Sequence, residues 1–361
     1  MTSARRAGAP PLRGALLGTG PISIYQMIAW QAIPDVKIVA LANRTRSKAE
    51  DMGRQFGIDD KHIYADYREL LDHEDLDFVD IATAPAIHRE QVLAVAGHHL
   101  DIFCQKPFAT SMAEAHEMQL ACKDGGVRCI VNENWRWRRC YQETKSLLDQ
   151  GTIGKPRYCR IQTHDDSVLP RPDGATPPLL VREPTLAVLD KLIVFDQAIH
   201  FIDTMRFLFG RIERVYAHIG HTSPLVKGDD LGVIILEFQN GAVGVIDTSY
   251  GTYDSGDKKG LIRGNVDPFV AEGAAGTIEL DPYQDDSIII VTGKDVQRHS
   301  ALPGMAPAQA YQESFNNTQR HFVQCLRSGE MAQNELSDNL ETLAAMFAAY
   351  ESAATGRAIA L

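Results

Sequence analysis

The 361-residue sequence has few cysteines, no extended basic segment and no long apolar run, and each shortage excludes a class of protein. No apolar stretch reaches the roughly 18 residues that a membrane-spanning helix needs, so we expect no membrane association. The net charge of −11 disfavours binding to nucleic acid or to an anionic membrane surface. The six cysteines show neither a C-x-x-C pair nor the spacing of metal ligands. We therefore expect reduced thiols, no metal site and a cytoplasmic protein.

The N-terminal half alternates short apolar runs with amphipathic segments. No apolar segment follows the arginines of "MTSARRAGAPPLRG", so we predict no secretory signal and a flexible tail over residues 1–12. The apolar runs that follow are nearly continuous, as in strands buried on both faces of a parallel sheet. They lie at residues 14–18, 36–42, 76–83, 100–104 and 127–131. Runs of this kind separated by helical segments predict an α/β fold, with a doubly wound parallel sheet over residues 13–135.

The pattern changes in the second part of the chain, which we assign to one further domain, residues 136–361. Residues 151–166 alternate like an antiparallel strand, and the Pro-rich stretch 167–184 predicts a long loop. Strands around a Gln-Asn-Gly turn follow, which indicates an α+β domain with a mostly antiparallel open sheet. A terminal helix is predicted over residues 338–355, and it can pack within this domain or against the first one.

A glycine-rich turn after the first predicted strand indicates a dinucleotide site. Gly18-Thr19-Gly20 lies between a strand and a helix, which is the context that such a loop requires. Gly18 permits the tight turn, and Gly20 lets the backbone approach a pyrophosphate at the helix N-terminus, together with Pro21 and Ile22. Ser23 takes the place of the third glycine and is small enough for close packing. An ordinary strand–turn–helix connection is the alternative.

The end of the second predicted strand bears on the choice of cofactor. NAD-binding loops carry an acidic residue for the ribose about 20 residues after the glycines. This chain has Asn43 there, followed by Arg44, Thr45 and Arg46. Loss of the carboxylate removes repulsion toward a 2′-phosphate, and the arginines supply positive charge, which favours NADP slightly. Asn43 can also bond a ribose hydroxyl, so both NAD and NADP stay open.

Together with the glycine loop, four further segments resemble the Gfo/Idh/MocA family of NAD(P)-dependent sugar and cyclitol oxidoreductases. They are "ATAPAIHREQ", "CQKPFATS", "GTIGKP" and "DQAIHFID", in the family's order. The resemblance extends from residue 13 to the C-terminus. It implies a Rossmann dinucleotide-binding domain, a C-terminal domain whose open sheet often supports dimers or tetramers, and a role in carbohydrate metabolism. A homodimer or homotetramer is therefore expected.

The resemblance also implies where the catalytic residues lie. The family's E-K-P element aligns with Gln105-Lys106-Pro107, which places its conserved lysine on Lys106 and a neutral amide where the family has a glutamate. Its D-x-x-x-H element falls on Asp196 and His200. The Gly-Gly that often precedes this element is replaced by "KLIVF", and the segment before it is extended and Pro-rich. The sugar is therefore not assigned by the resemblance.

A third family element, T-P-x-x-x-H, aligns with Thr83 through His88 and places Pro85 beside the nicotinamide. The resemblance thus implies cofactor-binding roles for Thr83, Pro85, His88, Gln105 and Lys106.

The chemistry of an alcohol oxidation suits these residue types. Asp196 and His200 are four residues apart, so on a helix they share one face. Hydride leaves a carbon while its hydroxyl loses a proton, and histidine can accept that proton near neutral pH. We assign His200 as general acid/base, Asp196 as its orienter or a hydroxyl anchor, and Lys106 as electrostatic partner and proton relay. Whether Lys106 or His200 takes the proton first stays open, and an ordinary helix ion pair is the alternative.

Further polar residues are candidates for contact with the substrate. Asn134 and Arg136 close the last predicted strand of the first domain, and His164 ends the first strand of the second. Their hydrogen-bonding groups suit a polyhydroxylated substrate, although a structural role is equally open for each. Trp135 and Trp137 either stack on a sugar ring or pack within the protein.

The sequence thus predicts an enzyme that transfers hydride between a nicotinamide cofactor and a secondary alcohol or ketone of a sugar, glycoside or cyclitol. One alternative is a redox-neutral, glycoside-oxidising enzyme that keeps its dinucleotide tightly bound. Others are a reductase of imines or double bonds and a non-catalytic dinucleotide-binding regulator. A regulator has no need for Lys106, Asp196 and His200 together, which argues against it.

Overall fold

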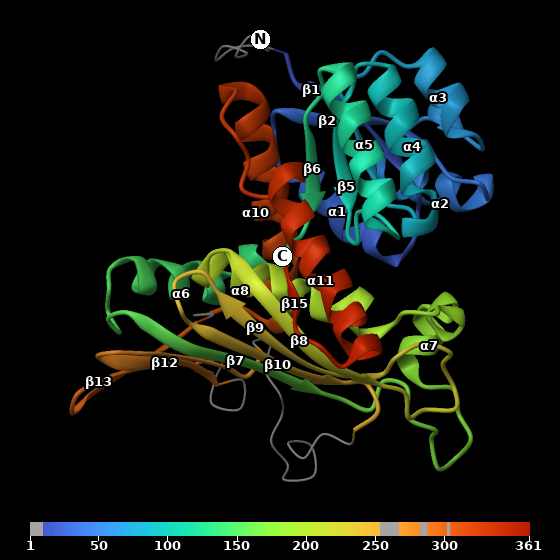
Figure 1. Ribbon diagram of the computed structural model, residues 1–361. Helices are drawn as coiled ribbons and strands as arrows, with labels where there is room; N and C mark the ends of the chain where they lie inside the picture. The colour runs from blue at the N-terminus through green and yellow to red at the C-terminus, as the bar shows by residue number, and fades with distance from the viewer. Residues whose placement is uncertain (1–9, 253–266, 282–286, 302–303) are drawn as a thin grey trace. The chain divides into compact units, whose positions relative to one another are not determined.

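The computed structural model describes residues 10–252, 267–281, 287–301 and 304–361, and it divides into two compact units (Figure 1). The first unit comprises Met1–Asn134 and Gln312–Leu340, and the second comprises Trp135–Tyr311 and Glu341–Leu361. We assigned residues 136–361 to one further domain, whereas residues 312–340 group with the first unit. Of the predicted tail, residues 1–9 lie outside the described residues, and the first strand begins at Leu12.

The first unit is built on six parallel strands in the order β3-β2-β1-β4-β5-β6, which confirms the predicted doubly wound sheet. The order reverses between β1 and β4, and ligands of such sheets bind beyond the carboxyl ends of the strands at this point. The strands are β1 (Leu12–Leu17), β2 (Val36–Ala42), β3 (Ile63–Tyr64), β4 (Phe78–Ile81), β5 (Asp101–Gln105) and β6 (Cys129–Asn132).

Helices connect these strands, and their ends follow from local sequence. The helix after β5 is capped at its start by Ser111, whose hydroxyl accepts a hydrogen bond from the amide of Glu114. Gly126, in the left-handed conformation, caps its end. The helices are α1 (Pro21–Gln31), α2 (Arg46–Phe56), η1 (Asp60–His62), α3 (Tyr67–His73), α4 (Pro85–Gly97) and α5 (Met112–Gly125).

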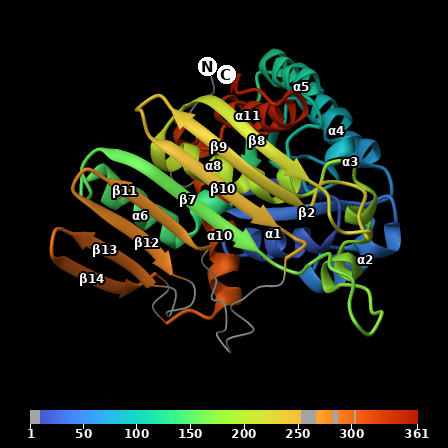
Figure 2. The same cartoon turned by 60° about the horizontal axis from the view of Figure 1, so that its bottom comes forward.

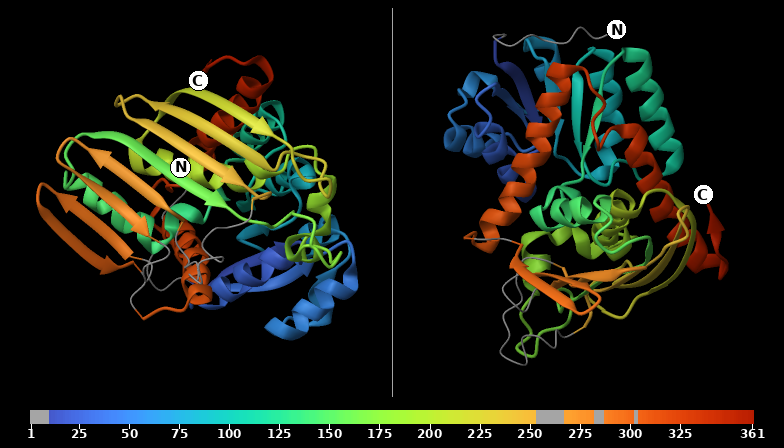
Figure 3. Two further views of the ribbon diagram at one scale, coloured as in Figure 1. Left: turned by 90° about the horizontal axis from the view of Figure 1, so that it is seen from below. Right: turned by 90° about the vertical axis from the view of Figure 1, so that its left-hand side faces the viewer.

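Aromatic packing explains why residues 312–340 belong to the first unit. The ring of Trp30 on α1 contacts Phe78 on β4 and Phe103 on β5, with centroids 4.9 and 5.4 Å apart. Phe322 lies on α10 (Pro307–Ser328) and packs against all three rings, 5.2–6.0 Å away. Figure 3 shows α10 beside the strands of this unit. The buried aromatic cluster therefore draws a distant part of the chain into the first core.

The second unit is built on a nine-stranded, mostly antiparallel sheet, as predicted. Its order is β14-β13-β12-β11-β7-β10-β9-β8-β15, and β7 pairs with β10 in parallel. Figure 2 shows this sheet as a broad open surface with α6 and α8 behind it. The strands are β7 (Pro156–His164), β8 (Ile212–Gly220), β9 (Leu231–Phe238), β10 (Val243–Ser249), β11 (Phe269–Gly273), β12 (Gly276–Asp281), β13 (Ser287–Thr292), β14 (Asp295–Ser300) and β15 (Ile359–Ala360).

Helical segments of the second unit carry two of the candidate catalytic residues, Asp196 and His200. The predicted Pro-rich loop contains one short helix, and the terminal helix begins two residues before its predicted start. None of the helices within the described ranges is long and apolar enough to cross a membrane. The segments are η2 (Trp135–Trp137), α6 (Arg139–Asp149), α7 (Pro178–Arg182), η3 (Pro184–Val188), the π-helical turn η4 (Val194–Ala198), α8 (Ile199–Phe209) and α11 (Leu336–Thr355).

Candidate active site

The glycine loop at the end of β1 has the shape of a dinucleotide-binding turn. Gly18 has a φ of +93°, and a Cβ added there would lie 2.7 Å from the carbonyl oxygen of Ala82. Both the backbone conformation and this close approach therefore require glycine. A Cβ added to Gly20 would meet no described atom within 4 Å, so the backbone is open to a ligand at the start of α1. Pro21 and Ile22 form the first turn of that helix.

Ser23 does more than replace a small residue. It is fully buried, and its hydroxyl donates a hydrogen bond to the carbonyl oxygen of Gly18 over 2.9 Å. The third position of the motif thus holds the loop closed through a side chain. The hydroxyl of Thr19 is buried without a hydrogen-bond partner among the described residues. An orphaned donor and an open backbone in one loop fit the pyrophosphate of a dinucleotide.

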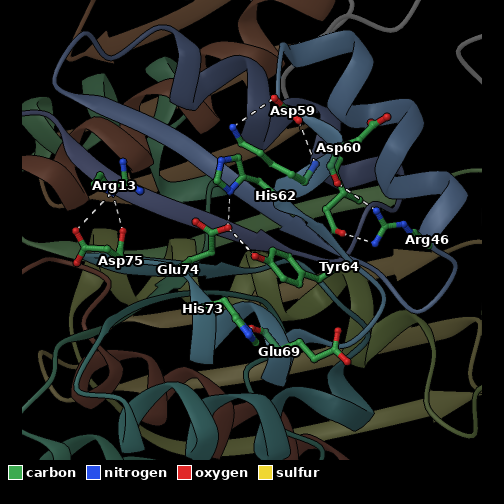
Figure 4. Close-up of polar contacts among 12 residues, drawn as sticks. Arg13, Arg46, Asp59, Asp60, His62, Tyr64, Glu69, His73, Glu74 and Asp75 are labelled. Atoms are coloured by element: carbon green, nitrogen blue, oxygen red, sulfur yellow. Dashed lines mark hydrogen bonds and ion pairs between the residues drawn. The ribbon is translucent and has the colours of Figure 1, made fainter.

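The two arginines after β2 differ in what they contact. Arg46 donates a hydrogen bond to the carboxylate of Glu50 over 2.8 Å. It also donates to the backbone carbonyl oxygen of Asp60 over 3.1 Å (Figure 4). Its guanidinium is therefore engaged by the protein itself. Arg44 is exposed and forms no hydrogen bond or ion pair with any described residue. The side-chain amide of Asn43 donates to the carbonyl oxygen of Thr45. Of the positive charge predicted for a 2′-phosphate, only that of Arg44 is available.

His88 supports the loops around the cofactor-binding edge instead of presenting a free ring. It is fully buried, and its ring nitrogens lie 3.0 Å from the carbonyl oxygen of Thr83 and 3.1 Å from that of Phe108. Burial lowers the pKa of His88. Its two contacts join the turn after β4 to the turn after β5. Pro85 is the first residue of α4, and the hydroxyl of Thr83 donates to the side chain of Gln91.

Lys106 follows the carboxyl end of β5, the edge at which Gly18, Asn43 and Thr83 also lie. Its side chain is partly exposed, and its peptide bond to Pro107 is cis. The preceding Gln105 is buried, and its side-chain oxygen accepts a hydrogen bond from the backbone amide of Lys106 over 2.7 Å. The neutral amide that replaces the family's glutamate therefore fixes the backbone from which Lys106 extends.

Two asparagines end the sixth strand in different ways. The amide of Asn134, predicted to contact substrate, donates to the hydroxyl of Ser314 over 2.8 Å and is buried. Asn132 is fully buried opposite Gln105, and neither atom of its amide has a hydrogen-bond partner in the described part of the chain. Such orphans are rare in folded proteins. Asn132 is not among the predicted site residues, although a polar residue at the end of an apolar run was a signal for it.

In the second unit, Asp196 lies in the π-helical turn η4 and His200 in the first turn of α8. Single π-helical turns are rare in proteins, and those that occur often lie at functional sites. The hydroxyl of Tyr250 donates to the carboxylate of Asp196 over 3.4 Å. Burial, followed by the nearby carboxylates, raises the pKa of Tyr250, so this phenol stays a donor. Tyr250 directly follows β10, and no local pattern predicted its contact because Asp196 is 54 residues away in the sequence.

Trp135 packs within the protein on both of its faces. The imidazole of His200 stacks on it with ring centroids 4.0 Å apart, and the guanidinium carbon of Arg138 lies 3.7 Å from the same centroid. Two groups this close cannot share one face, so Trp135 is held between them. Its ring nitrogen donates to Asp267 over 3.0 Å. Trp137 is buried. Neither tryptophan offers a face for a sugar, which decides that alternative in favour of packing.

Arg136 is a buried structural residue in the second unit. Its Nε donates to Asp203 over 2.7 Å and its terminal nitrogen over 2.5 Å, so the guanidinium faces the carboxylate with two parallel bonds. The hydroxyl of Thr342 donates to the same carboxylate over 3.0 Å. The two guanidinium nitrogens of Arg136 are thus engaged by a planar carboxylate, and the substrate contact expected from Arg136 stays a prediction. His164 is partly exposed and lies 2.7 Å from the carboxylate of Asp247.

Comparison with protein families gives two matches along the chain. The model described as an oxidoreductase family with an NAD-binding Rossmann fold matches residues 12–133. The model of the GFO/IDH/MocA C-terminal domain matches residues 141–267. The two matches follow the order of the two folds described above.

Individual relatives extend over almost the whole sequence. The chain is 34% identical to D-apiose dehydrogenase from Paraburkholderia graminis, over 97% of this chain and 89% of that protein. It is 26% identical to myo-inositol 2-dehydrogenase from Thermotoga maritima, over 97% and 98% respectively. An oxidoreductase from Agrobacterium radiobacter, solved in complex with NAD+, L-tartaric acid and magnesium, superposes with a TM-score of 0.87 at 32% identity. That comparison covers 97% of this chain and 98% of the other.

Proposed function

The chain belongs to the Gfo/Idh/MocA family of NAD(P)-dependent oxidoreductases, and we propose that it oxidises a secondary hydroxyl of a small free sugar. The observation that carries the proposal is the glycine loop, where Gly18 is sterically required and Gly20 is open to a ligand. The similarity to a D-apiose dehydrogenase along nearly the full length of both chains supports a sugar as substrate, in preference to a cyclitol or a glycoside.

The candidate residues have distinct roles in this reaction. When bound, the nicotinamide supplies the hydride acceptor. We assign to His200 the removal of the hydroxyl proton, and to Asp196 the orientation of that histidine or of a neighbouring hydroxyl. Lys106 stabilises the negative charge that develops on the substrate oxygen and relays the proton. Tyr250 donates to Asp196 and so limits the directions in which this carboxylate can turn.

A dinucleotide-absorbance assay tests the proposed function. The purified chain is incubated with NAD+ or NADP+ and a panel of free pentoses, cyclitols, anhydrosugars and glycosides. We expect reduced nicotinamide to accumulate with a free sugar and not to accumulate in the His200→Ala variant. Tight dinucleotide binding without reduction by any substrate would contradict the proposal. That outcome would favour the regulator or the redox-neutral, glycoside-oxidising enzyme.

We propose that the enzyme accepts both NAD and NADP, because the exposed Arg44 supplies charge for a 2′-phosphate and Asn43 stands where NAD-binding loops carry a carboxylate. Replacing Arg44 by Ala should raise the KM for NADP+ about tenfold, the effect of losing one charge-assisted contact. The KM for NAD+ should stay unchanged. Lys48→Ala removes an exposed charge from the same helix region and serves as the control. Equal effects of Arg44→Ala on both cofactors would argue against this role.

We also propose that the chain forms a homodimer or homotetramer through the outer face of its nine-stranded sheet. Val233 on β9 is 37% exposed there, and the neighbouring outward residues of β9 and β10 are largely apolar. Light scattering of the purified chain measures the mass, and a monomer would contradict the expectation.

A further inference from the structure

The segment that leads into the π-helical turn is held by groups from two other parts of the second unit. A helix start leaves backbone amides without partners inside the helix, and such groups are usually satisfied by one capping side chain and water. Here four consecutive amides each have a protein acceptor. Leu192 donates to Asp229 Oδ1, Ile193 to the Asp229 carbonyl oxygen, Val194 to Asp229 Oδ2 and Phe195 to the Tyr350 hydroxyl, over 2.9, 2.9, 2.9 and 3.1 Å.

Asp229 and Tyr350 form one network. The hydroxyl of Tyr350 lies 3.0 and 3.2 Å from the two carboxylate oxygens of Asp229 and donates its single proton to this carboxylate. Burial, followed by the Asp229 charge, raises the pKa of Tyr350, which keeps its proton in place. Asp229 is 7% exposed, and its negative charge faces the positive end of the helix. The phenol therefore accepts from the helix and donates to the carboxylate at the same time.

Asp230, the residue after Asp229, holds Tyr250, whose hydroxyl donates to Asp196. The carbonyl oxygen of Asp230 accepts a hydrogen bond from the backbone amide of Tyr250 over 2.9 Å. Its carboxylate accepts from the amides of Thr222 and Ser223 over 2.8 and 2.6 Å. The dipeptide Asp229-Asp230 thus holds both the helix start that carries Asp196 and the strand end that carries Tyr250.

The backbone next to this dipeptide is closely packed at Gly228. A Cβ added to Gly228 would lie 2.7 Å from the carbonyl oxygen of Leu189 and 3.0 Å from the amide nitrogen of Leu192. The two backbones are therefore in direct contact immediately before Asp229. We call Asp229 and Tyr350 together the clamp.

We infer that Asp229 and Tyr350 are positioning residues for hydride transfer, and this inference rests on the proposed function. They hold the π-helical turn in one register, so that Asp196 keeps its contact with Tyr250 and His200 keeps its place in the first turn of α8. Neither clamp residue touches the substrate in this role. Their loss should disturb the geometry of the reaction more than the binding of either ligand.

The test uses Tyr350→Phe, which removes one hydroxyl and keeps the ring. The kcat for sugar oxidation should fall about tenfold, while the KM for sugar and the Kd for dinucleotide change less than about twofold. Backbone hydrogen exchange at Phe195 should accelerate, because its acceptor is lost. Tyr67→Phe is the matched control. It removes a phenol that donates to Glu90 on the surface of the first unit, and all four quantities should remain unchanged.

A second variant, Asp229→Asn, tests the same inference if Tyr350→Phe does not fold. In Asp229→Asn an NH2 group replaces one of the oxygens that accept from Leu192 and Val194, so kcat should fall further than in Tyr350→Phe. Faster exchange at Phe195 with an unchanged kcat would show that the clamp is only structural and would overturn the inference. A wild-type chain that oxidises no sugar would instead overturn the proposed function, and the inference with it.

Discussion

Replacing Lys106 by Met is expected to abolish turnover while leaving dinucleotide affinity nearly intact. Lys106 follows the carboxyl end of β5, at the edge where ligands of a doubly wound sheet bind. Met preserves most of the side-chain length and removes the charge that stabilises a developing alkoxide. Loss of one such preorganised group lowers kcat by about 10²–10³-fold, and loss of the proton relay adds to this. Steady-state kinetics and fluorescence titration with dinucleotide measure the two quantities.

The same substitution at Lys123 is the control. Lys123 is exposed in the last turn of α5, which leads into β6 and so lies at the opposite edge of the sheet. Lys123→Met should leave both turnover and affinity unchanged. If Lys106→Met keeps more than about a tenth of the wild-type kcat, the assignment of Lys106 to the reaction is wrong. If it instead weakens dinucleotide binding in proportion to kcat, Lys106 is a cofactor contact only.

The fold was largely predictable because its sheets leave different apolar patterns. Strands buried on both faces read as continuous apolar runs, and this located β1, β2, β4, β5 and β6. The return of residues 312–340 to the first unit was not predictable in this way. It depends on the contact of Phe322 with Trp30 and Phe78, which precede it by 292 and 244 residues, and no local pattern records such a contact.

The glycine loop of the candidate site was predictable, but the partners of the other candidate side chains were not. The glycine loop has a signature because steric limits act on the backbone within a few residues. Arg136, His88 and Trp135 carry groups that suit ligands equally well as internal partners. Arg136 pairs with Asp203, and His88 contacts two backbone carbonyls. Trp135 packs between a histidine and an arginine. Composition cannot separate these uses, because the same hydrogen-bonding groups serve both.

Asp80→Asn is expected to stabilise the first unit increasingly as the pH rises from about 4 to about 8. Asp80 is fully buried on β4, and burial raises its pKa from 3.8 to about 8. The hydrogen bond from Trp30 Nε1, over 2.6 Å, lowers this pKa but does not offset burial. Gln26 Nε2 donates to the other carboxylate oxygen over 2.9 Å. In the variant the Asn oxygen can accept from Trp30. Its NH2 can donate to the side-chain oxygen of Gln26, which has no partner among the described residues, once that amide turns over.

The direction of this pH dependence follows from the number of protons that Asp80 binds in the folded and in the unfolded chain. Between pH 4 and 8 the unfolded chain loses the Asp80 proton and the folded chain keeps it, so wild-type stability falls with pH through this group. The loss is about 1.4 kcal/mol per pH unit, and it levels off above pH 8. Calorimetric melting of the wild type and of Asp80→Asn, without dinucleotide and at steps of half a pH unit from about pH 4 to about pH 8, measures the difference in their stability. Asp75→Asn changes a 98% exposed carboxylate of the same unit and should give no pH-dependent gain. A gain from Asp80→Asn that is constant with pH would mean that Asp80 titrates alike in the folded and unfolded chains, and that its two hydrogen bonds balance burial after all.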